Sequence, residues 1–131
     1  MSDFDPVAAA RELQPLIRAH ADESERGRRL AATAVDALRD SGIFMMGLSA
    51  AMGGQEVPTA QALRAIEEIS YADGAAGWNV MIAFDTAVWA GFLRGASREL
   101  IKSMSRPIVC GSLSSPGRIE KADGGYRISG R

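Results

Sequence analysis

The side chains that most often act as nucleophiles, bases or metal ligands are scarce in this sequence. It has one cysteine, Cys110, and one histidine, His20, and the two lie far apart along the chain. A thiol nucleophile needs a nearby base, and a zinc site needs several ligands. No Gly-x-Ser-x-Gly segment is present to expose a serine nucleophile on a sharp turn. These residues therefore predict neither a metal centre nor a complete active site.

One apolar stretch, residues 75–93, contains a carboxylate, Asp85, near its middle. A charge at the centre of a bilayer costs about 2.5–3.5 kcal/mol, so we expect a buried helix and not a membrane span. Asp85 then either faces solvent at an interface or pairs with an arginine, because an unpaired buried carboxylate is costly.

Composition places the chain among ordinary globular proteins. Its 131 residues are 47% hydrophobic and 24% charged, which allows one domain with its own core. Fifteen Lys and Arg against 16 Asp and Glu give a net charge of −1, which offers no basic surface for nucleic acid or an anionic membrane. A single cysteine excludes an internal disulfide, and the N-terminus lacks a secretion signal, so we expect a cytoplasmic protein.

Apolar periodicity predicts five helices before residue 105. Asp5 and Pro6 are expected to start the first helix, and Pro15 should kink or delay it. Thr59 is expected to cap the third helix and Asp73 the fourth. The predicted ranges are 6–20, 31–41, 59–72, 74–92 and 97–104.

The faces of these helices follow from the same pattern. The third helix should bury Leu63, Ile66 and Ile69 on one face, with Arg64, Glu67 and Glu68 mostly outside. The fourth helix is apolar on nearly every side, which predicts a central helix with Trp89 in the core. The polar run at 22–29 is expected to be a solvated helix end or face.

Residues 43–58 are apolar but are interrupted by glycines and Pro58, which predicts a packed loop. This loop contains Met45, Met46 and Met52. Methionines can form a soft binding surface, but they more often fill irregular gaps in a core, and we expect that second role here.

After Pro107 the pattern changes to short strands. We expect strands at 108–113, 118–122 and 126–129, with a hairpin turn at 123–125, because its glycines tolerate positive φ. Cys110 should be a small buried residue of the first strand. Three short strands have no buried face of their own, so the segment is typical of the start of a β-domain.

In this order the segments resemble the acyl-CoA dehydrogenase superfamily, and within it the branch of flavin-dependent monooxygenases. The resemblance rests on LRDSGIFMMGLSAAMGGQEV (38–57), AIEEISYADGAAGWNV (65–80) and GSLSSPGRIEKADGGYRISGR (111–131). Ala51 or a neighbour stands where the family's Gly-Gly loop has a proline. The segment 112–117 lacks the polar motifs of the dehydrogenases proper and is closer to the monooxygenase branch.

The resemblance implies a mainly α fold. Residues 1–106 would form the N-terminal helical domain, and residues 107–131 the first strands of an incomplete middle β-domain. The match covers most of this chain but about a third of a family member, whose C-terminal helices form a tetramer. We therefore expect a truncated chain that associates through exposed apolar surface when expressed alone.

The resemblance also implies flavin chemistry, with FMN or FAD, O2 and the hydroxylation of a small substrate, which we expect to be aromatic. A flavin reductase would be the partner, and catalytic residues would lie beyond residue 131. Ser112 and Ser114 are expected to bond the flavin, or else to be turn serines that bond local backbone. Trp78 would be a flat wall for the substrate, or else a core tryptophan.

Two other functions remain open. An acyl-CoA dehydrogenase would use FAD to oxidise an acyl thioester. A non-enzymatic interaction module would instead bind a partner in a groove formed by the fourth helix and the methionine-rich loop, and it would have no affinity for flavin.

Overall fold

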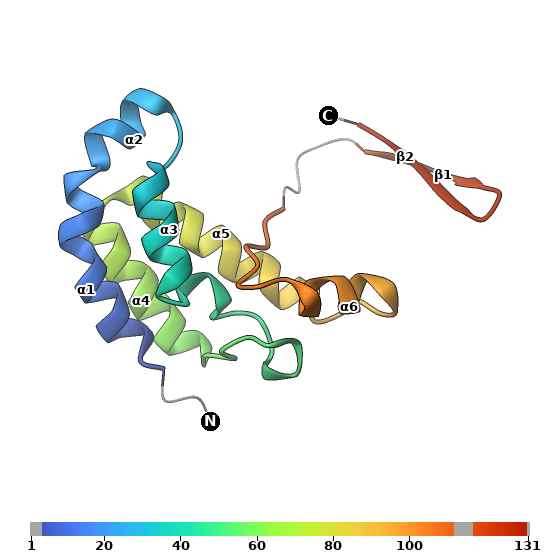
Figure 1. The fold of residues 1–131 in the computed structure, drawn as a ribbon, viewed down its shortest axis with the longest axis horizontal. Helices are drawn as coiled ribbons and strands as arrows, with labels where there is room; N and C mark the ends of the chain where they lie inside the picture. Colours follow the sequence, from blue (N-terminus) through green and yellow to red (C-terminus); the bar gives the residue numbers. More distant parts are fainter. Residues whose placement is uncertain (1–3, 112–116, 131) are drawn as a thin grey trace.

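The computed structural model describes residues 4–111 and 117–130, and it is mainly α-helical, as predicted (Figure 1). The described part has six helices where five were expected, because the polar run forms a short helix of its own. The elements are α1 (Pro6–Ala19), α2 (Ala21–Gly27), α3 (Ala32–Asp40), α4 (Thr59–Ala72), α5 (Gly74–Ala90), α6 (Ala96–Ser103), β1 (Arg118–Ala122) and β2 (Gly125–Ser129).

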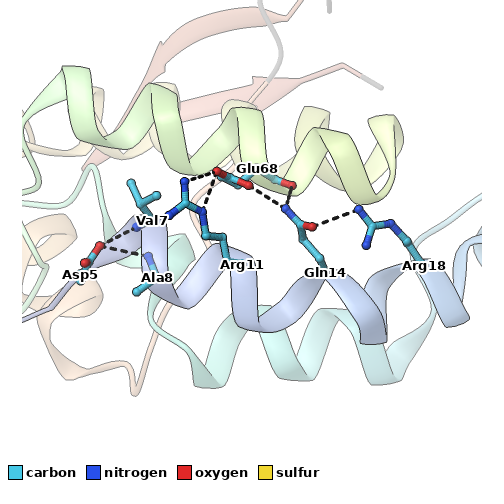
Figure 2. A network of polar contacts seen from close by, with 7 residues as sticks. All are labelled: Asp5, Val7, Ala8, Arg11, Gln14, Arg18 and Glu68. Carbon is cyan, nitrogen blue, oxygen red and sulfur yellow. Dashed lines mark hydrogen bonds and ion pairs between the residues drawn. The ribbon is translucent and has the colours of Figure 1, made fainter.

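The start of α1 is as the sequence predicts. One carboxylate oxygen of Asp5 accepts hydrogen bonds from the backbone N–H groups of Val7 and Ala8, each at 3.0 Å (Figure 2). Pro6 is the first helical residue, where its missing N–H is not needed. The helix continues through Pro15 to Ala19, so this proline does not end it.

A polar seam holds α1 beside α4, with Glu68 at its centre (Figure 2). Oε1 of Glu68 accepts from Nε of Arg11 at 2.8 Å, and its Oε2 accepts from Nε2 of Gln14 at 2.8 Å. The hydrogen bond and then the charge of Glu68 raise the pKa of Arg11 above its ordinary value. The Glu68 side chain is only 20% exposed and faces α1. The expectation that Glu68 lies mostly outside is therefore wrong.

Two alanines and an isoleucine form the buried face of α4. Ala62, Ala65 and Ile69 are buried and Ile66 packs half-buried against the core, which confirms the inward positions of the two isoleucines. Leu63 is 55% exposed, so its predicted inward position is wrong. Alanines at the contact let neighbouring helices approach closely, which explains why the larger residue is outside. The predicted cap is also wrong, because Thr59 is the first helical residue and no side chain caps α4.

The main core lies between α1, α3, α4, α5 and a short 3-10 helix, η1 (Ile43–Met45). A smaller apolar cluster lies beside a second such helix, η2 (Ala50–Met52). The main core consists of Ala10, Ile17, Leu38, Ile43, Phe44, Met46, Ala62, Ala65, Ile69, Ala76, Val80 and Ala83.

The loop at 43–58 is packed, as predicted. Met45, Met46 and Met52 are all buried, which confirms that they fill the core. Backbone hydrogen bonds close the loop on itself, among them those from Gln55 N to Met45 O at 3.0 Å and from Val57 N to Met46 O at 2.9 Å.

The two strands form an antiparallel hairpin, in which Ile119 pairs with Ile128. Gly124 has φ 79° in the turn, as the Asp-Gly-Gly sequence predicts. Every residue of both strands is exposed, so the hairpin buries no face within the described chain. The prediction of a strand at 108–113 is wrong for residues 108–111, which belong to no strand. Residues 112 and 113 lie outside the described residues.

Candidate functional site

Helix α5 buries mainly small residues and exposes both of its tryptophans, although Val80 is buried and Phe84 packs against the core. Its buried residues are Ala76, Gly77, Val80, Ala83, Ala87 and Ala90. Trp78 is 62% exposed and Trp89 63%. The expectation of a helix buried on all sides is therefore wrong for the described structure, and so are the core positions considered for both tryptophans.

Two residues at the start of α5 set this orientation. Asp73 caps the helix by accepting a hydrogen bond from Ala76 N at 2.6 Å. A Cβ on Gly77 would lie 2.9 Å from the Cα of Ser70 and still closer to its hydroxyl, so α4 and α5 can touch here only because Gly77 has no side chain. This contact directs Gly77 inward and the next residue, Trp78, outward.

The exposed side of α5 is a continuous stripe that we call the aromatic face: Trp78, Ile82, Asp85 and Trp89, with Phe92 just after the helix. Spacings of four and three residues keep these side chains on one side of a helix. The rings of Trp89 and Phe92 have centroids 5.9 Å apart. Trp89 thus shares a face with Trp78, and the spacing in the sequence could have shown this.

The segment after α6 lies along this region. Nη1 of Arg106 donates to the carbonyl of Asp40 at 3.0 Å and to its carboxylate at 2.8 Å, which joins the segment to the end of α3. Ile108 and Val109 pack against the two core clusters. A Cβ on Gly111 would lie 3.3 Å from Cγ2 of Thr86, so the backbone just before residue 112 lies beside α5.

This segment offers hydrogen-bond donors beside α5. No hydrogen bond joins the backbone N–H groups of residues 108–111 to another described residue. Backbone N–H groups can bind a neutral or anionic oxygen without placing a charge in the site. Ser112 and Ser114 follow directly but lie outside the described residues, so their role stays a prediction.

The structure also shows the positions of Cys110, His20 and Asp85. Cys110 is exposed, so its expected burial is wrong, because no sheet covers this segment in the described chain. His20 follows α1 and is half-buried, with Nδ1 3.1 Å from a carboxylate oxygen of Glu23. Asp85 is exposed and belongs to none of the ion pairs among the described residues. Of its two expected positions, the structure thus favours the one that faces solvent over a pair with an arginine.

Metal and membrane chemistry find no support in the described ranges. Residues 4–111 and 117–130 contain no group of three or more His, Cys, Asp or Glu side chains that could hold a metal ion. The helices placed by the structure are too short or too polar to cross a bilayer.

One hollow of the described structure lies away from the aromatic face. It has a volume of about 1080 Å³ and lies between the start of α1, the 43–58 loop and α4. Its lining mixes both signs of charge, and its Arg11 is already paired with Glu68. The hollow contains none of the candidate residues found in the sequence, so we place the candidate site on the aromatic face.

Comparisons with known proteins agree on one family. The model of the acyl-CoA dehydrogenase N-terminal domain matches residues 7–112. The oxygenase component of an FADH2-dependent resorcinol hydroxylase from Rhizobium sp. (strain MTP-10005) is 32% identical over 88% of this chain and 29% of its own length. Indole-3-acetate monooxygenase from Pseudomonas putida is 28% identical over 87% of this chain and 29% of its own.

Two further comparisons extend this result. A pigment production hydroxylase from Rhodococcus sp. (strain ATCC 21145) is 29% identical over 91% of this chain and 31% of its own length. XiaF from Streptomyces sp., solved in complex with FADH2 and glycerol, has the same fold, with a TM-score of 0.88 and 22% identity over 94% of this chain and 31% of its own. The chain thus spans about three tenths of the length of these relatives.

Proposed function

Because the chain belongs to the acyl-CoA dehydrogenase family through its N-terminal domain, we propose that it is the helical part of a flavin-dependent monooxygenase. The reaction would use reduced flavin and O2 to hydroxylate a small aromatic substrate. The names of the curated relatives are the observation that carries this proposal, because all three are hydroxylases or monooxygenases that align over most of this chain. Resorcinol and indole-3-acetate, named for two of them, are both aromatic.

The proposed cofactor is a reduced flavin, FAD in preference to FMN, because FADH2 appears in the names of a relative and of the solved neighbour. When bound, the flavin supplies the electron and oxygen chemistry. Ser112 and Ser114 would bond the polar edge of its ring. The donors at 108–111 and the approach of Gly111 to Thr86 fit this role, because they offer neutral hydrogen-bond donors beside α5.

The aromatic face would form one wall of the substrate pocket. Trp78 and Trp89 are flat, exposed and on the same side of α5, which suits the stacking of an aromatic ring. A reduced flavin must be supplied by another enzyme, so we also propose a flavin reductase as partner, in keeping with the words "oxygenase component" in one relative's name.

The proposed organisation keeps two units: a helical domain at 1–106 and the start of a middle β-domain at 107–131. The anchoring of Arg106 to Asp40 and the exposed hairpin support a boundary near residue 106. We further propose a cytoplasmic homo-oligomer, as a tetramer, in which other parts of the protein and its copies cover the aromatic face.

Two alternatives make different predictions. An acyl-CoA dehydrogenase is compatible with the family and would oxidise a thioester with FAD. A non-enzymatic interaction module is favoured by one observation, the uncovered apolar side of α5, on which Trp78, Trp89 and Phe92 are all more than 60% exposed. Such a module would bind a protein partner there and would not bind flavin.

The test is an assay of the full-length protein with chemically reduced FAD, O2 and either resorcinol or indole-3-acetate. We expect at least one of the two compounds to give a hydroxylated product that contains one oxygen atom from labelled O2. Oxidation of an acyl-CoA by an artificial electron acceptor, with no oxygen incorporated, would favour the dehydrogenase. Absence of flavin binding together with absence of both reactions would favour the interaction module.

A further inference from the structure

We propose that Asp85, beside the ring of Trp89, recognises a hydrogen-bond donor on the substrate. The site would then take neutral aromatic molecules with a hydroxyl or N–H group and disfavour those with a carboxylate. This inference rests on the proposed function and adds the substrate class. It starts from the position of Asp85, which is the one charged residue of the aromatic face.

The spacing makes Asp85 and Trp89 neighbours. Residues four apart on a helix lie on the same side, separated by about 6 Å along the axis. Helical side chains lean toward the N-terminus, so the indole of Trp89 leans over the turn that carries Asp85. A ring that stacks on this indole therefore presents its substituents near the carboxylate, with Ile82 as an apolar contact one turn earlier.

The charge of Asp85 needs a partner when the face is covered. A carboxylate only accepts hydrogen bonds, and within the described residues it has no ion pair. Substrate and cofactor on the aromatic face would exclude water, and a carboxylate without water is costly unless a donor replaces it. A phenolic hydroxyl or an indole N–H provides that donor, whereas a substrate carboxylate adds a like charge.

An arginine from another part of the protein could fill the same need. Asp85 would then be a structural residue, and its charge would have no effect on which substrate binds. The two roles differ in a measurable way, because a structural ion pair contributes to stability and a substrate contact contributes to selectivity.

The experiment compares the full-length wild type with Asp85→Asn, which keeps the size of the side chain and removes its charge. Two pairs of probes separate the two effects: resorcinol and its dimethyl ether differ in their hydroxyl donors, and indole and indole-3-acetate differ by a carboxylate. Dissociation constants come from calorimetry with flavin bound, and kcat/KM from product formation. We expect the preference for resorcinol and the preference for indole each to fall about tenfold in the variant.

The control is Glu67→Gln, which removes one charge from an exposed position on α4. It should leave both preferences unchanged, and neither variant should shift the melting temperature. Unchanged preferences in Asp85→Asn overturn the inference. A lowered melting temperature in the same variant would then assign Asp85 to a structural ion pair. In either case, hydroxylation by the wild type upholds the proposed function.

The proposed function can also fail separately. If the wild type hydroxylates no probe but binds them with an Asp85-dependent preference, the inference holds and the monooxygenase assignment falls. If the wild type binds none of the probes, both fall.

Discussion

Side-chain size, more than hydrophobicity, decides which side of α5 is buried. Alanines and Gly77 face the core, while Trp78 and Trp89 face outward, although all of these residues are apolar or small. Small residues let helices approach closely and bring many atoms into contact, so a buried face can be built without large side chains. The large side chains are then available for binding.

The serines at the start of the β-segment carry a direct prediction. If Ser112 and Ser114 bond the flavin ring, replacing both with alanine removes up to two hydrogen bonds of about 1 kcal/mol each. The flavin dissociation constant of the full-length protein should then rise about fivefold for each bond lost. Binding should persist, because backbone donors remain.

A flavin titration of the double variant measures this effect. The matched control replaces two serines elsewhere, Ser103 and Ser129, which are exposed on α6 and β2. Equal affinities in the two double variants would contradict the prediction and would assign the Ser112 and Ser114 hydroxyls to local turn structure.

The contact between α4 and α5 depends on Gly77. A methyl group there would collide with the backbone and hydroxyl of Ser70, so Gly77→Ala should force the two helices apart. Overpacking of this kind costs about 1–3 kcal/mol, which outweighs the gain in helix propensity of about 1 kcal/mol. Since Trp78 is the next residue, its position should shift as well.

Thermal or denaturant unfolding of Gly77→Ala checks the loss of stability. Gly74→Ala is the control, because it places the same methyl group on the same helix where nothing lies within 4 Å. That variant should be as stable as the wild type or slightly more so. If both substitutions had the same effect, the close approach of the helices at Gly77 would not be what stabilises their contact.

The caps of α1 and α5 and the hairpin turn could be predicted from the sequence because few residue types can form them, whereas the cap predicted at Thr59 was wrong. Asp5 before Pro6 and Asp73 before α5 both cap as expected, and Gly124 takes the positive φ of the hairpin turn. The packed loop and its buried methionines were also predicted, since an apolar segment with several glycines cannot form a long helix or strand.

The open side of α5 could not be predicted in this way. Periodicity finds a buried face by contrast between apolar and polar positions, and α5 has little contrast, since its outward stripe is apolar except for Asp85. The prediction that Cys110 is buried in a strand was wrong for a related reason. An extended segment and a strand have the same local pattern, and they differ only in the partners that lie beside them.

The described structure has a well-packed core, but it also exposes many large apolar side chains on its surface. Large apolar side chains are exposed on α5, on α6 and on the hairpin, among them Trp89, Phe92 and Leu100. Contiguous apolar surface of this kind drives association in water. We therefore expect the 131-residue chain alone to form dimers or larger species.

Sedimentation at a series of concentrations measures this association. Replacing Trp89 and Phe92 together with glutamine should shift the chain toward monomer. Tyr126 and Ile128 of the hairpin, which are 67% and 74% exposed, are replaced in the same way in a second variant, which measures how much of the association the hairpin contributes. A wild-type chain that stays monomeric at every concentration would contradict the expectation.

The outward position of the tryptophans has an optical consequence. Trp78 and Trp89 are the two tryptophans of the sequence, and both lie on the aromatic face. Indole emission moves to shorter wavelength when water around the ring is replaced by apolar groups. The fluorescence of this chain therefore reports when the outer side of α5 becomes covered, while the core behind it, which contains Phe44 but neither tryptophan, contributes no indole signal.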